Sequence, residues 1–258
     1  MEGLAADRTT RPVPAPAPLM SLRGIGKTFG SQAALRGVDL DLFGGECLGL
    51  VGDNGAGKST LSKIMSGAYL PDSGRILLSG TEVRMAGPAE ARAQRVEMVY
   101  QDLSLCDTID VAGNLFLGRE IARRGFLHKA AMRAEGRRML DALGIRIPSM
   151  RAKVAQLSGG QRQSIAIARA AAFQPQVLLL DEPTSALAVA EVEAVLALIN
   201  RVKAQGVAVV LVTHRLQDLF RVCDRIAFMY EGTKVAERRA DETNLEEVVQ
   251  LIVGGSRA

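Results

Sequence analysis

A stretch of nine residues constrains the fold of this chain more than any other. It fits the phosphate-binding pattern G-x-x-x-x-G-K-[ST] at every fixed position, and its residues are Gly52, Asp53, Asn54, Gly55, Ala56, Gly57, Lys58, Ser59 and Thr60. The apolar run 46–51 before it predicts a buried strand, and residues 61–67 after it predict a short helix that ends at a glycine. The backbone N–H groups of such a loop hold a polyphosphate. Lys58 would reach the outer phosphates and Ser59 would coordinate Mg²⁺, so we predict a site for a nucleoside triphosphate with Mg²⁺.

The composition is that of an ordinary globular protein, with 48% hydrophobic and 23% charged residues in a chain of 258. No apolar run approaches the roughly 18–20 residues that cross a bilayer, and the first residues lack the apolar core of a secretory signal. Cys47, Cys106 and Cys223 are too few and too scattered for a disulfide or zinc framework. We therefore expect a cytoplasmic protein with reduced thiols.

The net charge of +4 raises the question of nucleic-acid binding. Lysines and arginines are spread along the chain, however, and no basic stripe with interleaved aromatic residues occurs. The arginine-rich piece 119–138 also contains Glu120 and Glu135, and we interpret it as a solvated helical face. Contact of this piece with nucleic acid or anionic lipid is the alternative. We expect no nucleic acid as a partner.

The order of the predicted elements indicates an α/β fold. Prolines at alternate positions in residues 1–19 rule out a helix or a central strand, so this tail is expected to be disordered. The alternating run 38–42 predicts an antiparallel strand, whereas the apolar runs 177–181 and 207–212 alternate with helical segments and predict a parallel sheet covered on both faces. Helical periodicity continues almost throughout 110–172. We therefore expect a P-loop NTPase (RecA-like) core over 20–258, with an antiparallel β layer and an inserted helical subdomain at about 102–172.

A second element of the phosphate site follows the predicted strand 177–181. Asp181 would stand at the carboxyl end of that strand, where P-loop enzymes hold Mg²⁺. Glu182 would lie beside the terminal phosphate and could polarise an attacking water. The alternative is that Asp-Glu-Pro is only a turn in which Pro183 ends the strand. The presence of the phosphate loop favours the functional interpretation.

The stretch Ser158, Gly159, Gly160 and Gln161 opens a predicted helix and is a further anion-binding helix start. Its position between the helical subdomain and the Asp-Glu-Pro strand makes the chain resemble the ATP-binding cassette (ABC) ATPases over nearly all of its length. The resemblance implies that this signature stretch covers the ATP held by the phosphate loop of a second subunit. Two ATP molecules would then lie head-to-tail in a homodimer.

The resemblance also implies roles for single residues. Phe29 falls where the family stacks an aromatic ring on adenine, and Gln101 matches the glutamine that links Mg²⁺ and the terminal phosphate to a membrane partner. Asp181 matches the aspartate that supports Mg²⁺, Glu182 the catalytic base, and His214 the histidine that contacts the terminal phosphate. Lys58 and Gln101 complete this catalytic set, with Ser59, Gln101 and Asp181 as the metal ligands.

One position departs from the family pattern. After Asp-Glu-Pro-Thr-Ser the family usually reads Ala-Leu-Asp, whereas this chain reads Ala186-Leu187-Ala188. The missing aspartate normally helps to couple the two sites of the dimer. Its absence bears on the symmetry or the rate of hydrolysis, but not on the binding of ATP.

Residues 99–106 and 114–120 resemble the monosaccharide-import branch of the bacterial cassette ATPases. Each motif occurs once, which is similar to the single-cassette, fructose-type importers. The resemblance implies a cytoplasmic subunit on the inner face of the membrane, bound to permease subunits and, through them, to a periplasmic or extracellular sugar-binding protein.

Two alternative functions are compatible with a phosphate loop. A non-transport cassette ATPase acting on nucleic acid or ribosomes would usually carry coiled-coil insertions, tandem cassettes or a basic arm, and none is visible in the sequence. A P-loop kinase would leave the Ser-Gly-Gly-Gln stretch and His214 unexplained.

Overall fold

The computed structural model describes residues 17–254. Of the tail predicted for 1–19, residues 1–16 lie outside the described part. Leu19 already belongs to the folded structure, because its N–H donates to the carbonyl oxygen of Leu42 at 2.8 Å and its own carbonyl accepts from the N–H of Ser79 at 2.8 Å. Within 17–254, no helix has both the length and the apolar character to cross a bilayer.

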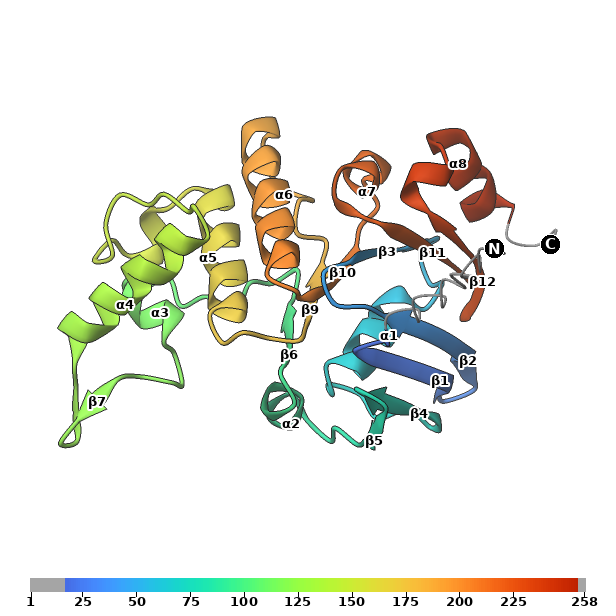
Figure 1. Cartoon of the computed structure of the whole chain (residues 1–258), viewed down its shortest axis with the longest axis horizontal. Coiled ribbons are helices and arrows are strands. Elements are labelled where there is room, and N and C mark those ends of the chain that lie inside the picture. The colour runs from blue at the N-terminus through green and yellow to red at the C-terminus, as the bar shows by residue number, and fades with distance from the viewer. Residues whose placement is uncertain (1–16, 255–258) are drawn as a thin grey trace, which may run out of the picture.

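A six-stranded sheet forms the centre of the molecule (Figure 1). Its strands are, in spatial order, β12 (Thr233–Arg239), β11 (Arg225–Tyr230), β3 (Cys47–Gly52), β10 (Ala208–Val212), β9 (Val177–Asp181) and β6 (Val96–Val99). Only β12 is antiparallel to its neighbour; the other pairs are parallel. Parallel strands bring their carboxyl ends to one edge, so the residues that follow β3, β6, β9 and β10 meet there.

A second, antiparallel sheet covers one face of the central sheet. Its order is β2 (Gln32–Leu42), β1 (Met20–Phe29), β4 (Ser73–Leu78) and β5 (Thr81–Val83), of which β5 was not predicted. The alternation predicted for 38–42 is confirmed, because Val38, Leu40 and Leu42 are buried while Asp39 and Asp41 point away from the core. The predicted antiparallel layer is therefore present.

Helices cover the opposite face of the central sheet, as Figure 1 shows above β3 and β10. They include α6 (Val189–Ala204), α7 (Leu216–Val222) and α8 (Leu245–Val253). The sequence predicts these helices at 190–203, 215–221 and 245–253, within one residue of the observed bounds at each end. Helix α1 (Lys58–Met65) lies on the same side as the antiparallel sheet, and α2 (Pro88–Ala93) precedes β6. The prediction of a sheet covered on both faces is confirmed, although β-strands supply most of the cover on one of them.

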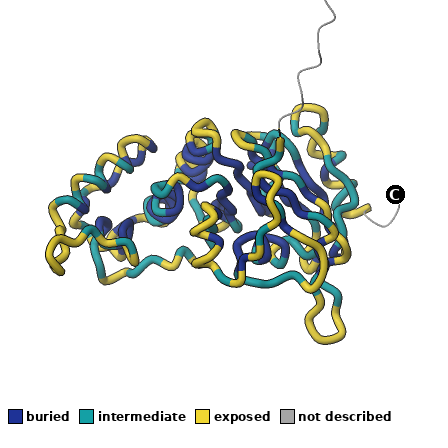
Figure 2. Tube along the Cα trace, turned by 60° about the horizontal axis from the view of Figure 1, so that its bottom comes forward, coloured by how far each residue is buried: buried dark blue, intermediate teal, exposed yellow. Residues whose placement is uncertain are grey.

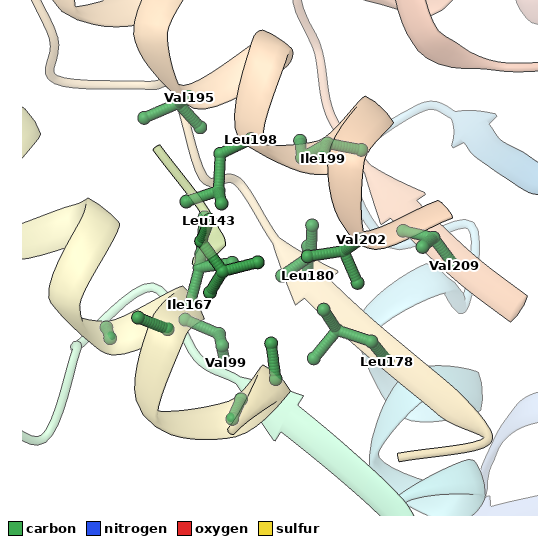
Figure 3. Packing of buried hydrophobic residues seen from close by; sticks show 14 of the residues in the cluster. Val99, Leu143, Ile167, Leu178, Leu180, Val195, Leu198, Ile199, Val202 and Val209 are labelled. Carbon is green, nitrogen blue, oxygen red and sulfur yellow. The ribbon is translucent and has the colours of Figure 1, made fainter. Parts of the chain in front are cut away.

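The strand β9 connects two hydrophobic cores because its side chains alternate between the faces of the sheet. Leu178 and Leu180 point toward α6, where they pack near Val202 in the cluster drawn in Figure 3. Val177 and Leu179 point the other way, into the core shared with the antiparallel sheet. These four of the five β9 side chains are at most 1% exposed, and their packing on both faces fixes the position of the strand end at Asp181.

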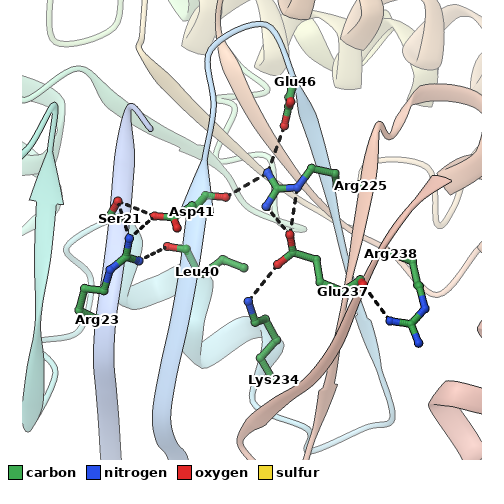
Figure 4. Close-up of polar contacts among 9 residues, drawn as sticks. All are labelled: Ser21, Arg23, Leu40, Asp41, Glu46, Arg225, Lys234, Glu237 and Arg238. Carbon is green, nitrogen blue, oxygen red and sulfur yellow. Dashed lines mark hydrogen bonds and ion pairs between the residues drawn. The ribbon is translucent and has the colours of Figure 1, made fainter. Parts of the chain in front are cut away.

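Arg225 joins the two sheets near their edge (Figure 4). Its guanidinium donates to Glu46 Oε2 at 3.1 Å, to the carbonyl oxygen of Asp41 at 3.3 Å, and from Nε to Glu237 Oε1 at 3.0 Å. Lys234 donates to the other oxygen of Glu237 at 2.9 Å. One side chain thus links β2, the residue before β3, β11 and β12.

The helical subdomain differs in part from the prediction. It contains α3 (Val111–Leu115), α4 (Lys129–Ala142), a 3₁₀ turn at Val154–Gln156 and α5 (Gly159–Ala171), but residues 122–127 form a hairpin of β7 (Ala122–Arg123) and β8 (Phe126–Leu127). The interpretation of 119–138 as one helical face is wrong for its first ten residues. Arg124 and Gly125 have φ angles of +53° and +83°, the pattern of a two-residue hairpin turn.

Candidate functional site

The phosphate loop connects the end of β3 to the start of α1, and glycines decide its shape. The φ angles of Gly55 and Gly57 are +85° and +98°, values that favour glycine. A Cβ atom on Gly57 would lie 2.7 Å from the carbonyl oxygen of Ala34, so a larger residue does not fit. No side chain caps the helix start at Gly57. The first N–H groups of α1 are therefore suited to an anionic ligand.

Lys58 is the first residue of α1, and its ammonium group lies against the loop itself. Nζ donates hydrogen bonds to the carbonyl oxygens of Gly52 at 2.7 Å and Asp53 at 2.9 Å. Gly52 and Asp53 thus serve the site through their backbone. Burial lowers the pKa of Lys58, while the negative charges of Glu182, Asp53 and Asp181 act in the opposite direction. The lysine and the carboxylates after β9 therefore belong to one electrostatic unit.

Two acidic residues follow one another at the carboxyl end of β9. Burial raises the pKa of Asp181, and the charge of Glu182 raises it further. Glu182 has a left-handed φ of +51°, and its N–H donates to the carbonyl oxygen of Val212 on β10 at 2.9 Å. A residue other than glycine in this region costs roughly 1 kcal/mol or more. The packed end of β9 holds Glu182 in this strained conformation.

His214 follows β10 by two residues and reaches the side chain of Glu182. Its Nδ1 atom lies 2.7 Å from Glu182 Oε2, with the histidine 68% exposed and the glutamate 17% exposed. This contact is an ion pair when the imidazole is protonated, and no other group among the described residues donates to the buried Oε2 atom. A buried carboxylate oxygen with a single exposed partner is incompletely satisfied. This oxygen therefore favours a ligand that brings a further donor or a positive charge.

A cavity of about 410 Å³ lies at the phosphate loop, a volume within the range of small-molecule sites. Of the predicted site residues described above, Gly52, Asp53 and His214 do not line it. The predicted residues that line it are Phe29, Asn54, Gly55, Ala56, Gly57, Lys58, Ser59, Thr60, Gln101, Asp181 and Glu182. The Phe29 ring is 44% exposed and meets Tyr69 edge to face, with ring centres 5.4 Å apart. Gln32, Ala34 and Val212 also line the cavity. No motif marks them; Gln32 is there because it pairs with Phe29 across β1 and β2.

The side-chain oxygen atoms in this cavity are suitable ligands for a magnesium ion. Ser59, Gln101 and Asp181 can offer oxygen atoms, which Mg²⁺ prefers. The raised pKa of Asp181 and the Glu182 Oε2 atom, whose one partner is the exposed His214, indicate negative charge that a cation would stabilise. No group of three or more His, Cys, Asp or Glu side chains able to hold a metal occurs among residues 17–254. A divalent ion here would therefore share its coordination with phosphate oxygens and water.

The signature stretch lies outside this cavity. Ser158 caps α5 by accepting from the N–H of Gln161 at 3.3 Å, while Gln161 Oε1 accepts from the N–H of Ser158 at 3.1 Å. Ser158, Gly160 and Gln161 line a separate hollow together with Glu191, and Gly159 faces Leu187. Within one chain, the structure does not bring Ser158–Gln161 to Lys58.

Glu191 is a residue of this second region that the sequence reasoning missed. Its Oε1 accepts from the N–H of Gly160 at 3.0 Å and its Oε2 from the N–H of Ala188 at 3.2 Å. Hydrogen bonding from Ser158, then from these two N–H groups, lowers the pKa of Glu191. A signal was present, because a glutamate three residues after a helix start is half of a capping box. Ala188 cannot supply the other half, since it has no side-chain acceptor.

The sequence of this chain is similar to those of known ATP-binding proteins of transporters. The family model described as ABC transporter matches residues 35–185. The chain is 42% identical to the xylose/arabinose import ATP-binding protein of Sulfolobus acidocaldarius, over 91% of this chain and 93% of the relative. It is 41% identical to the fructose import ATP-binding protein of Rhizobium meliloti, over 92% and 94%.

Other relatives are longer. The ribose import ATP-binding protein of Chromobacterium violaceum is 43% identical over 91% of this chain but only 47% of its own length, so the chain spans about half of it. The solved dimer of the ATP-binding cassette MJ0796, bound to ADP and Pi, superposes with a TM-score of 0.72 at 27% identity, over 86% of this chain and 98% of that one. The predicted fold class is confirmed. The chain belongs to the ABC transporter family and is one of its ATP-binding cassettes.

Proposed function

We propose that this chain is the ATP-hydrolysing subunit of an importer for a monosaccharide. One observation carries the proposal: Lys58, Gln101 and Glu182 come from three distant segments and line a single cavity. The names of the relatives from Sulfolobus acidocaldarius and Rhizobium meliloti, which match over nearly their whole lengths, support sugar import.

In the proposed mechanism, the N–H groups of residues 55–60 and the Lys58 ammonium hold the phosphates of ATP, and Phe29 stacks on adenine. Ser59, Gln101 and Asp181 would hold Mg²⁺, which neutralises charge on the phosphates when bound. Glu182 accepts a hydrogen bond from the attacking water and aligns it with the terminal phosphate, and His214 contacts that phosphate. Catalysis then comes mainly from positioning and electrostatic stabilisation.

The proposed working unit is a homodimer. In one chain the signature residues Ser158, Gly159, Gly160 and Gln161 lie outside the phosphate cavity, so a second copy is needed to bring them to the ATP. Head-to-tail pairing would give each cavity the signature helix of its partner. The solved dimer of a related cassette supports this assembly.

The permease would bind between the core and the helical subdomain. A hollow of about 310 Å³ lies there, at the strand that leads to Gln101, and Arg92, Glu97, Tyr100, Leu103, Arg119 and Phe173 are among the residues that line it. Arg119 lies over the Phe173 ring at 3.7 Å and donates to Glu97 Oε1 at 3.0 Å. Binding there would hold the chain on the inner face of the membrane, with a sugar-binding protein reached through the permease.

The test uses the variant Glu182→Gln, which keeps the size of the side chain but removes its charge. We expect it to bind MgATP, to hydrolyse it at least about 100-fold more slowly, and to shift from monomer to dimer with ATP when its mass is measured in solution. Wild-type protein should release ADP and phosphate without a phosphorylated sugar. Hydrolysis at the wild-type rate by a monomeric variant would refute the proposal.

A further inference from the structure

The hairpin of β7 and β8 is the most exposed part of the helical subdomain. It lies at the far end of the subdomain in Figure 1, and residues 122–130 are all exposed, as the yellow tip in Figure 2 shows. Phe126 is 80% exposed and Leu127 is 54% exposed. Two large apolar side chains at one turn do nothing for the core of this protein, so they indicate a surface that is covered by something else.

The same hairpin concentrates positive charge. Residues 117–138 contain seven arginines and lysines and two glutamates, a net charge of +5 against +4 for the whole chain. Both glutamates are engaged locally: Glu120 accepts from the N–H of Gly118, and Glu135 pairs with Arg138. Among residues 17–254, nothing forms an ion pair with Arg123, Arg124 or Lys129. These three cations around the turn are therefore free for an external anion.

The pairing of the strands places apolar and basic groups side by side. Arg123 is opposite Phe126, so both side chains project from the same face of the hairpin, while Leu127 is opposite Ala122 on the other face. Leu127 and the 50% exposed Leu117 border one hollow of the subdomain. The tip thus presents an aromatic and an aliphatic side chain between cationic groups.

We propose that the hairpin tip, residues 122–129, binds the surface of a bilayer that contains anionic phospholipid. Phe126 and Leu127 enter the boundary between headgroups and acyl chains, and Arg123, Arg124 and Lys129 contact lipid phosphates. Nucleic acid fits less well, because Phe126 is the single phenylalanine, tyrosine or tryptophan in residues 122–129 and the neighbouring Leu127 offers no stacking surface for a second base. The contact goes beyond the proposed function, since it requires neither ATP nor a permease.

The place of the hairpin in the chain agrees with this contact. Leu117 and Arg119 line the hollow assigned to the permease, and β7 begins three residues later. A subunit bound to a permease through that hollow would hold the hairpin beside it, on the side of the membrane. Lipid contact would then add a second attachment point to the protein contact.

The experiment measures co-sedimentation of the nucleotide-free chain with vesicles of phosphatidylcholine alone or mixed with phosphatidylglycerol. We expect binding only to the mixed vesicles, weakening as salt is raised. Phe126→Ser with Leu127→Ser should lower the partition coefficient by about tenfold. The variant Arg123→Ser with Arg124→Asn should lower the partition coefficient by about 20-fold. Asparagine is chosen at position 124 because it tolerates the positive φ angle there.

Matched controls remove equivalent groups elsewhere. Val249→Ser with Val253→Ser removes exposed apolar side chains from α8, and Arg75→Ser with Arg84→Ser removes exposed cations near β4 and β5. Both should leave vesicle binding unchanged, and all variants should still bind ATP. The absence of binding to mixed vesicles, or equal losses in hairpin and control variants, overturns the proposal. Hairpin variants that impair only binding to the purified permease would assign the tip to a protein contact instead.

Discussion

The phosphate loop and the signature stretch look alike in sequence, since each places glycines directly before a helix, but their backbone donors are in opposite states. At the start of α1, Gly57 provides no side-chain cap and Lys58 lies next to it. At the start of α5, Ser158 and Gln161 cap each other, and Glu191 accepts from the N–H of Gly160. The start of α1 is therefore suited to an anionic ligand, whereas the start of α5 is already occupied by the carboxylate of Glu191.

The pKa values of the carboxylates in the two regions are shifted in opposite directions. Burial and then the neighbouring Glu182 raise the pKa of Asp181, whereas hydrogen bonds from Ser158, Gly160 and Ala188 lower that of Glu191. Negative charge is thus disfavoured beside the phosphate loop and satisfied beside the signature stretch. A cation bound beside the phosphate loop would therefore stabilise the ionised carboxylates there. The Gly160 N–H, in contrast, becomes available to a ligand only if Glu191 is displaced.

The largest expected effect comes from placing one defect in each region. Lys58→Ala and Ser158→Glu should each lower ATP hydrolysis by about 100-fold or more, because each removes or reverses an interaction with the phosphates. If the two regions meet only between subunits, a mixture of the two variants should recover about a quarter of wild-type activity, since each mixed dimer has one intact site. Hydrolysis is measured before and after mixing with MgATP.

The control for this mixture combines Lys58→Ala with Glu182→Gln, two defects in the same half of the site. Every mixed dimer then has two damaged sites, and no activity should return. Equal recovery in both mixtures, or none in either, would contradict the division of the site between two subunits.

A smaller effect is expected from Glu191→Ala. The N–H groups of Gly160 and Ala188 lose their acceptor, so the free energy of unfolding should fall by about 1 kcal/mol. The dimer formed by the Glu182→Gln background with ATP should become tighter, because the Gly160 N–H is released for a phosphate. Urea unfolding and mass in solution measure the two effects. Glu193→Ala, which removes an exposed partner of Arg221, should change neither by much.

The smallest effect tests the charge stored beside the phosphate loop. The folded-state pKa of Asp181 is raised, so its ionised form costs stability above the pKa of the unfolded chain, and this cost disappears as the pH falls below about 4. Asp181→Asn should therefore stabilise the nucleotide-free protein at neutral pH, with a gain that shrinks in acid. Asp141→Asn, at an exposed position of α4, is the control. Destabilisation at neutral pH would show that Asp181 is better satisfied than we infer.

Much of the fold could be predicted because its signals are local. The strand 177–181 and the helix 245–253 were predicted at their observed bounds, since runs of apolar residues and helical periodicity depend on neighbours within a few positions. The hairpin at 122–127 was missed because strands of two residues show no alternation. Its turn residue Arg124 adopts a positive φ without being a glycine.

The sequence by itself determined the family, the parallel core and most of the residues that line the phosphate cavity, because each motif specifies its own backbone geometry; Gln32, Ala34 and Val212 came only with the fold. Only the tertiary structure decided that Glu191 lies against Gly160, that the buried Oε2 of Glu182 lies 2.7 Å from His214 Nδ1, and that Phe126 projects beside Arg123. The residues of the first two contacts are separated by about thirty positions, and the third depends on a strand register. Such contacts follow from how elements pack, which no local pattern encodes.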